Sequence, residues 1–145
     1  MITNRSVPTN AILPHVIYRD VSGAIVWLTK VFGFSEHYRY GSPADPSGAQ
    51  LHLADAYLMI ERARDRSTPA QIGHSTQYLT VFVEDIEAHY VRTKAAEARM
   101  VEELHETEYG ELQYAVEDLD GHRWIFSRHA RDLGPEQWGA TLAAG

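Results

Sequence analysis

The chain has 145 residues, of which 44% are hydrophobic and 23% charged, with a formal net charge of −7 and no cysteine. This size and composition are typical of one folded domain with its own core. The lack of cysteine excludes disulfides, thiol catalysis and cysteine metal sites, and the acidic balance argues against nucleic acid or an anionic membrane as partner. Because neither a long apolar stretch nor a signal-peptide core is present, we expect a cytoplasmic protein.

The first half of the chain predicts one β-α-β-β-β module. After a polar lead, a strand is expected over residues 13–19. A helix over residues 23–32 follows, because apolar side chains recur there at spacings of three and four. Asp20 or Ser22 is expected to cap this helix and Gly33 to end it. The other expected elements are a strand over residues 34–40, a loop over 41–48, and a hairpin of strands over 50–54 and 57–62.

A polar segment over residues 63–75 is expected to link this module to a second one. The second module repeats the order, with a strand over 77–83 and a helix over 86–96 that begins after Asp85. Its closing hairpin turns at residues 118–121, where Asp and Gly tolerate left-handed backbone angles. The remaining expected elements are a strand over residues 101–104, a turn over 109–111, strands over 112–117 and 123–128, and a terminal helix over about 135–142.

The two halves therefore repeat one pattern. Residues 18–34 and 81–98 each run from a β-rich stretch through an Asp-aliphatic pair into an amphipathic helix that carries a lysine. Such a repeat predicts two similar modules. The space between two such modules is the expected place for a ligand.

Three motifs stand in order along the chain: Asp20 to Phe34, Val83 to His89, and Tyr109 to Phe126. Together they resemble the motifs of the vicinal-oxygen-chelate superfamily. This superfamily includes glyoxalase I, fosfomycin-resistance enzymes, extradiol dioxygenases and bleomycin-resistance proteins. The third motif is similar to the closing signature Asp-Pro-x-Gly-His-x-Trp-x-Phe, with Leu119 in place of proline.

The resemblance implies an α+β fold, in which two βαβββ modules form a half-open, curved sheet cup with helices on the outside. A single domain over residues 1–145 would contain module one at about 11–64, module two at about 76–129 and the short C-terminal helix. Homodimers are common in this superfamily, so the resemblance also implies a homodimer.

Enzymes of this superfamily hold a divalent metal with four side chains, usually His, Glu or Gln, and its binding proteins lack these ligands. The fourth ligand position falls here on Ile125, which cannot bind a metal. The resemblance is therefore nearest to the metal-free, bleomycin-resistance-like members, with no cofactor. The alternative is a lyase, isomerase or dioxygenase that holds one divalent metal with His15, Glu61 and Gln77.

The function expected from these observations is binding of a small aromatic or amphipathic molecule in the cup. Tyrosine and tryptophan rings can stack on such a molecule, and the net negative charge favours a cationic or neutral one. Whether a reaction is catalysed stays open, and an accessory domain without any ligand is a third possibility. The expected ligand-binding residues are His15, Ile17, Tyr57, Met59, Glu61, Gln77, Leu79, Arg123 and Ile125.

Other conspicuous side chains have structural explanations. His105 stands in a run of glutamates that is typical of a solvated, loop-like surface rather than of a metal patch. Trp124 and Phe126 alternate with Ile125 and are expected to pack against the module helix, as is Trp27. The sequence has neither a Gly-rich phosphate loop nor a nucleophile elbow, so nucleotide binding and nucleophilic hydrolysis have no support.

Overall fold

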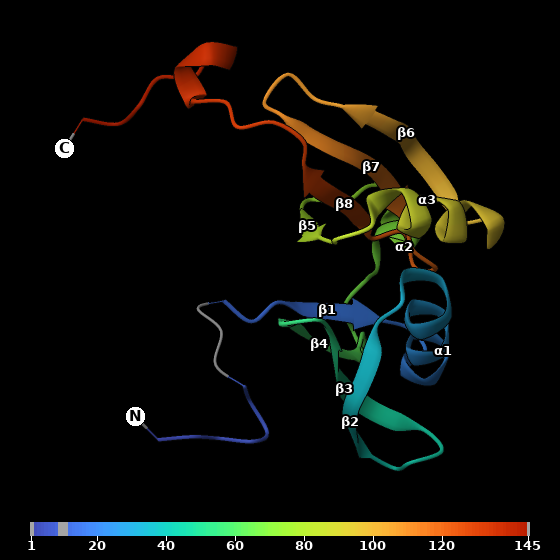
Figure 1. Cartoon of the computed structure of the whole chain (residues 1–145). Helices are drawn as coiled ribbons and strands as arrows, with labels where there is room; N and C mark the ends of the chain where they lie inside the picture. Colours follow the sequence, from blue (N-terminus) through green and yellow to red (C-terminus); the bar gives the residue numbers. More distant parts are fainter. Residues whose placement is uncertain (1, 9–11, 145) are drawn as a thin grey trace. The chain divides into compact units, whose positions relative to one another are not determined.

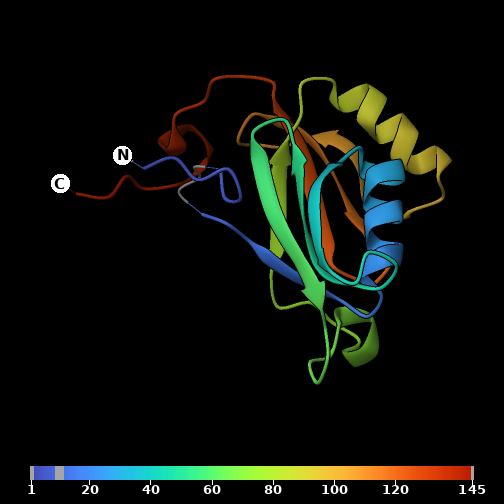
Figure 2. The same ribbon diagram turned by 90° about the horizontal axis from the view of Figure 1, so that it is seen from below.

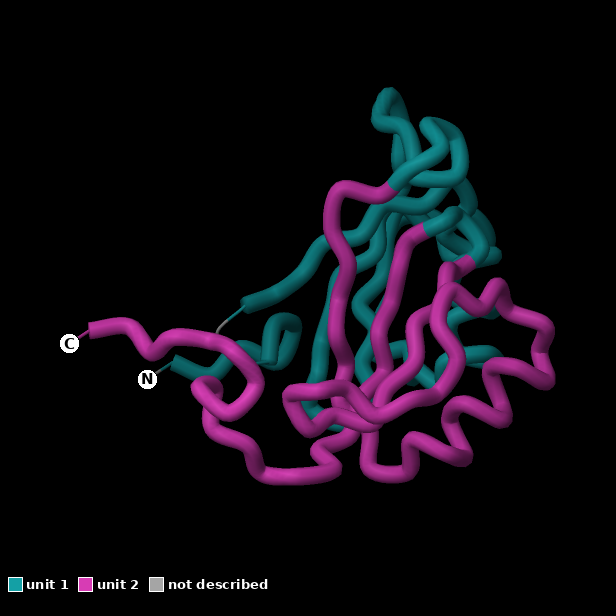
Figure 3. Tube along the Cα trace, turned by 90° about the horizontal axis from the view of Figure 1, so that it is seen from above, with its two compact units in different colours: residues 1–74, 119–121 teal, residues 75–118, 122–145 magenta. Residues whose placement is uncertain are grey.

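The computed structural model describes residues 2–8 and 12–144 (Figure 1). Its backbone divides into two compact units, which are coloured separately in Figure 3. Unit 1 comprises Met1–His74 and Leu119–Gly121, and unit 2 comprises Ser75–Asp118 and His122–Gly145. The predicted α+β class and the repeat of two modules are confirmed, because each unit contains a four-stranded mixed sheet of the same order.

Unit 1 is a four-stranded sheet with one helix on it. The strands lie in the order β1-β4-β3-β2, with β1 parallel to β4 and the other pairs antiparallel. The helix α1 contacts β3 and β4, and Figure 2 shows it along one side of this sheet. The elements are β1 (His15–Tyr18), α1 (Val21–Trp27) continued by a π-helical turn (Leu28–Phe32), β2 (Ser35–Gly41), β3 (Pro46–Leu53), β4 (Ala56–Arg62) and α2 (Pro69–Ile72).

The core of unit 1 follows from strand alternation. The set of alternate strand residues that includes Val16, Leu51 and Ile60 is buried and apolar, and so is the stripe of α1 that includes Ile25 and Leu28. These two surfaces pack together, which leaves the other face of the sheet to a different set of side chains.

Unit 2 repeats this plan with the strand order β5-β8-β7-β6, in which β5 and β8 are parallel. Trp124, Phe126 and Tyr114 are fully buried, and α3 covers them: the His89 ring lies 4.2 Å from that of Phe126. Trp124 and Phe126 are therefore core residues, as predicted. The elements are β5 (Tyr78–Phe82), α3 (Ile86–Ala95), β6 (Arg99–Glu106), β7 (Glu111–Glu117), β8 (Arg123–His129) and a 3₁₀ turn (Pro135–Trp138).

Several predicted boundaries in unit 1 need correction. The first helix begins at Val21, two residues before the predicted start. The side chain of Asp20, which precedes it, makes no capping hydrogen bond. The loop predicted over residues 41–48 is shorter, because β3 already begins at Pro46, a position where a strand tolerates proline. Trp27 is only half-buried, with its ring edge against Phe32.

Two further corrections concern the linker and the acidic segment. The predicted linker contains α2, which begins with a capping box of Thr68 and Gln71. The acidic segment around His105 is not a loop but the end of the long edge strand β6, whose charged side chains are exposed. Charged residues are common on edge strands because they discourage pairing with other chains. Among the described residues, no helix is long and apolar enough to cross a membrane.

Candidate functional site

The face of the unit 1 sheet opposite α1 carries polar and aromatic side chains. Residues paired across neighbouring strands share a face, so the ladders place His15 beside Met59, Met59 beside Gln50, and Gln50 beside Tyr38. We call this surface the polar face. Its side chains are His15, Ile17, His37, Tyr38, Tyr40, Gln50, His52, Tyr57, Met59 and Glu61.

Four rings form an aromatic cluster on the polar face. Tyr57 stacks on His52 with ring centres 5.0 Å apart and planes at 18°. His37 meets the Tyr57 ring edge-on at 6.2 Å and lies 5.1 Å from the ring of Tyr38. His37 is exposed and the other three rings are half-buried, so the cluster presents flat, partly dry surfaces of the kind that bind aromatic molecules.

A buried polar group lies beneath this cluster. Gln50 is fully buried, and its amide nitrogen donates to the Met59 sulfur at 3.4 Å. Its amide oxygen lies 2.6 Å from Nδ1 of His37. A β-bulge between Glu36 and Tyr38 makes His37 an extra residue of β2, so that His37 and Tyr38 both lie on this face.

Tyr40 closes one side of the polar face. It lies across Gly48 on the neighbouring strand, where even a single added carbon would clash with the Tyr40 hydroxyl oxygen. Burial, followed by the nearby Glu61 carboxylate, raises the pKa of the Tyr40 hydroxyl. Glu61 itself pairs with Arg66 at 3.2 Å. Gly48 is therefore required for Tyr40 to fold down onto the sheet.

The corresponding face of unit 2 is chemically different. His15 and Thr80 each stand five residues before the aspartate that precedes the module helix, and their paired neighbours are Met59 and Ile125. The ladder then continues from Ile125 to Ala115. Unit 2 thus has small or aliphatic side chains where unit 1 has histidine, methionine and glutamine.

The structure divides the predicted ligand-binding residues between the two units. Unit 1 brings five of them together on one face, whereas in unit 2 Arg123 and Ile125 share a face that the other predicted members do not join. The prediction that Leu79 shares a face with Ile125 is wrong, because Leu79 pairs with the buried Trp124 and so lies on the helix side of the sheet. Gln77 is exposed and lies just before β5, so it is not among the residues that pair with β8. The five unit 1 residues are His15, Ile17, Tyr57, Met59 and Glu61.

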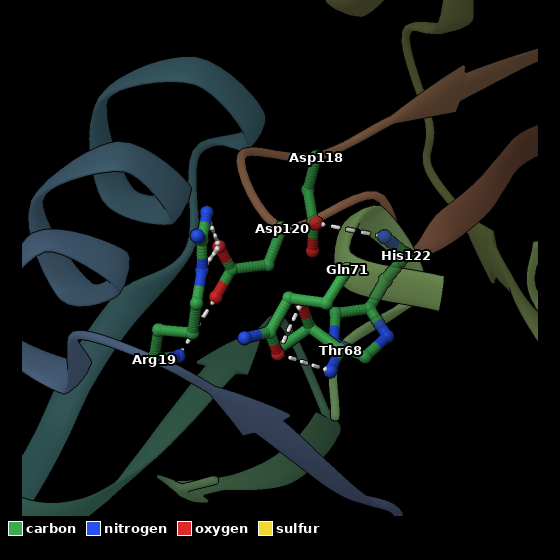
Figure 4. A network of polar contacts seen from close by, with 6 residues as sticks. All are labelled: Arg19, Thr68, Gln71, Asp118, Asp120 and His122. Carbon is green, nitrogen blue, oxygen red and sulfur yellow. Dashed lines mark hydrogen bonds and ion pairs between the residues drawn. The ribbon is translucent and has the colours of Figure 1, made fainter. Parts of the chain in front are cut away.

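The closing sequence signature has a structural role. The Asp118 carboxylate accepts a hydrogen bond from the backbone N–H of His122 at 3.0 Å (Figure 4). It also accepts one from the indole N–H of Trp124 at 3.0 Å. These bonds close the β7–β8 turn and fix the buried tryptophan. Gly121 in this turn has φ +85°, a left-handed conformation that favours glycine.

The tip of the same turn belongs to unit 1. The Asp120 carboxylate accepts from the backbone N–H of Arg19 at 2.8 Å and pairs with its guanidinium at 3.2 Å (Figure 4). The Asp120 carbonyl accepts from the Ala70 N–H at the start of α2. The second aspartate of the closing signature, Asp120, therefore anchors the turn.

The comparisons with known proteins agree with this architecture. The model of the Glyoxalase/Bleomycin resistance protein/Dioxygenase superfamily matches residues 11–126. The chain belongs to this superfamily.

Individual relatives span nearly the whole chain. TioX from Micromonospora sp. ML1 is 30% identical, with 86% of this chain and 100% of that chain covered and a TM-score of 0.70. An uncharacterized protein of Mycobacterium bovis is 24% identical over 92% of this chain and 93% of its own length. The fosfomycin resistance protein FosX from Listeria monocytogenes shares the fold at 16% identity, with 91% and 99% coverage and a TM-score of 0.61.

The three side chains of the alternative, metal-binding prediction are His15 and Glu61 in unit 1 and Gln77 in unit 2. Glu61 is engaged by Arg66, and the strand position of Ile125 offers no donor atom. Within residues 2–8 and 12–144, no group of three or more His, Asp or Glu side chains is placed to hold an ion.

Sequence reasoning missed Gln50 and His37. Gln50 reads as an ordinary polar strand residue, and nothing in the sequence marks it as fully buried. In a regular strand the adjacent residues His37 and Tyr38 would point to opposite faces, and only the bulge places both on one face. The one available signal was the concentration of histidine and tyrosine over residues 37–40 and 52–57.

Proposed function

We propose that this chain binds a small, flat aromatic molecule on the polar face of unit 1, without a metal and without making or breaking a bond. The observation that carries the proposal is the aromatic cluster of His37, Tyr38, His52 and Tyr57 above the buried Gln50 and Met59. Partly buried rings backed by a few oriented polar groups are the usual composition of a small-molecule site.

The chemistry of the surface supports this class of ligand. Stacked or edge-on aromatic pairs contribute about 0.5–1.5 kcal/mol each beyond the burial of their area. Met59 adds a polarizable sulfur, which makes favourable contacts with aromatic rings. The superfamily description includes bleomycin resistance proteins, and binding without turnover is consistent with a sequestering role of that kind.

The test is isothermal titration of the protein with naphthol, a flat aromatic probe. Tyr57→Ala removes the stacking ring of the cluster and should weaken binding by about tenfold, or ~1.4 kcal/mol. Tyr78→Ala is the matched control, because Tyr78 is an exposed strand tyrosine of unit 2, 58% accessible and outside the polar face. Equal loss in both variants, or loss only in Tyr78→Ala, would reject the proposed site.

A further inference from the structure

Three side chains form a polar path from the buried centre of the polar face to its exposed edge. Met59 is 9% exposed and Gln50 is fully buried, while His37 is exposed. Hydrogen bonds connect them in that order, from the Met59 sulfur to the Gln50 amide and from this amide to the His37 ring. The direction of each bond is fixed by chemistry, because the sulfur at the buried end can only accept.

The Met59 sulfur determines how the Gln50 amide is oriented. A thioether has no hydrogen to donate, so the amide NH₂ group must face it. The reverse orientation would put the amide oxygen against a second electron-rich atom in a buried place. The Tyr38 hydroxyl also directs its donor to this sulfur, at 3.8 Å. The amide oxygen of Gln50 is therefore the end that faces His37.

This orientation decides which nitrogen of His37 carries the proton. A carbonyl oxygen only accepts, so the Nδ1 atom 2.6 Å away must donate. The neutral ring is then the Nδ1–H tautomer, and Nε2 keeps a free lone pair. An imidazole without such a partner favours the proton on Nε2 instead. Within the described part of the chain, the Nδ1 bond is the one hydrogen bond of the His37 ring.

We propose that Gln50, oriented by Met59, holds His37 as the Nδ1–H tautomer, so that Nε2 accepts a hydrogen bond from a hydroxyl or N–H group of the aromatic ligand. This inference rests on the proposed function and narrows its ligand class to phenols and N–H heterocycles. His37 is the residue that determines specificity, and Gln50 and Met59 are positioning residues. The ring of Tyr57, edge-on to His37, provides the stacking surface beside the acceptor.

The tautomer is measured first, on the free protein. Proton–nitrogen correlation spectra of the histidine rings at pH about 8, where imidazole is neutral, should show Nδ1–H for His37. Met59→Leu keeps the volume but removes the sulfur, and should shift His37 toward Nε2–H. His52 is an internal reference, because its Nδ1 lies 3.1 Å from the Ala54 carbonyl and does not depend on Met59. An Nε2–H ring at His37 in the unsubstituted protein would overturn the inference.

Binding is measured next with naphthol and its methyl ether, which have the same rings but differ in the donor. Naphthol should bind about three- to tenfold more tightly, as expected for one hydrogen bond. This preference should fall toward unity in Met59→Leu and His37→Phe. Met100→Leu and His105→Phe, matched substitutions on β6 of unit 2, should leave it unchanged.

The outcomes separate the two proposals. Equal affinity of the unsubstituted protein for both probes overturns the role of Nε2 while leaving the aromatic site intact. Binding of neither probe, with His37 in the Nδ1–H form, overturns the proposed function and the ligand class but not the tautomer.

Discussion

The two sheets have the same strand order and the same parallel closing pair, yet the faces opposite their helices differ. In unit 1 the central row of that face reads His15, Met59, Gln50 and Tyr38, and in unit 2 the matching row begins with Thr80, Ile125 and Ala115. The backbone plan therefore fixes where a site can be built, while side chains decide which unit has one. The proposed binding surface is therefore assigned to unit 1 alone.

The largest effect is expected from the core of unit 2. Trp124→Ala removes a fully buried ring and its bond to Asp118, so the free energy of unfolding should fall by about 3–5 kcal/mol. Chemical denaturation followed by circular dichroism measures this. A loss below about 1 kcal/mol would contradict the structural role assigned to the closing signature.

The anchored turn should give the next largest effect. Asp120→Ala leaves the backbone N–H of Arg19 without its acceptor and should cost about 1–3 kcal/mol of unfolding free energy. The control is Asp45→Ala, whose 80% exposed carboxylate pairs with Arg62 and should contribute less than about 1 kcal/mol. Equal costs would show that the contact of Asp120 is only a surface ion pair.

Tyr114 in unit 2 and Tyr40 in unit 1 should respond differently to alkaline pH. Burial raises the pKa of Tyr114, whose hydroxyl donates to Thr93 at 2.8 Å. Its neutral form is the one the fold favours. Stability is therefore full below the ordinary tyrosine pKa of about 10 and is lost as pH rises through the higher folded-state value.

Urea denaturation at pH about 9 to 11 tests this difference, because the range spans the ordinary tyrosine pKa. Tyr114→Phe should flatten the decline in unfolding free energy. Tyr40→Phe should change it less, because Tyr40 is 42% exposed. The same slope in both variants would argue against burial as the cause.

The smallest effect should distinguish the two helix starts. The Asp85 side chain accepts from the Ala88 N–H at 3.0 Å, whereas Asp20 makes no such bond. Asp85→Ala should cost about 1 kcal/mol and Asp20→Ala a few tenths, as measured by thermal unfolding. If Asp20→Ala costs more than these few tenths, the Asp20 side chain also caps its helix, as that of Asp85 does.

These examples show what the sequence could and could not predict. Alternation and helix periodicity placed most strands, both main helices and the buried Trp124 and Phe126, because those patterns reflect burial on one face. The short helix α2 was missed although Thr68 and Gln71 carry its capping-box signal. The face of Leu79 was predicted wrongly, because a difference of one residue in register reverses every side chain.

The central features of the site were beyond prediction for a different reason. The shared face of His37 and Tyr38 depends on a bulge, and the burial of Gln50 on β3 depends on the strands on either side, β2 and β4. Neither property is local in sequence. The sequence therefore predicted Tyr57 and Met59, which lie on the polar face, but not the polar group Gln50 that connects Met59 to a histidine.

Binding of an aromatic molecule to the polar face of unit 1 is tested most directly by amide chemical shifts of isotope-labelled protein titrated with naphthol. The shifted amides should lie in β2, β3 and β4, around His37, Gln50 and Tyr57. Shifts confined to the unit 2 strands, or no shifts at saturating probe, would contradict the claim that the polar face of unit 1 is the recognition surface.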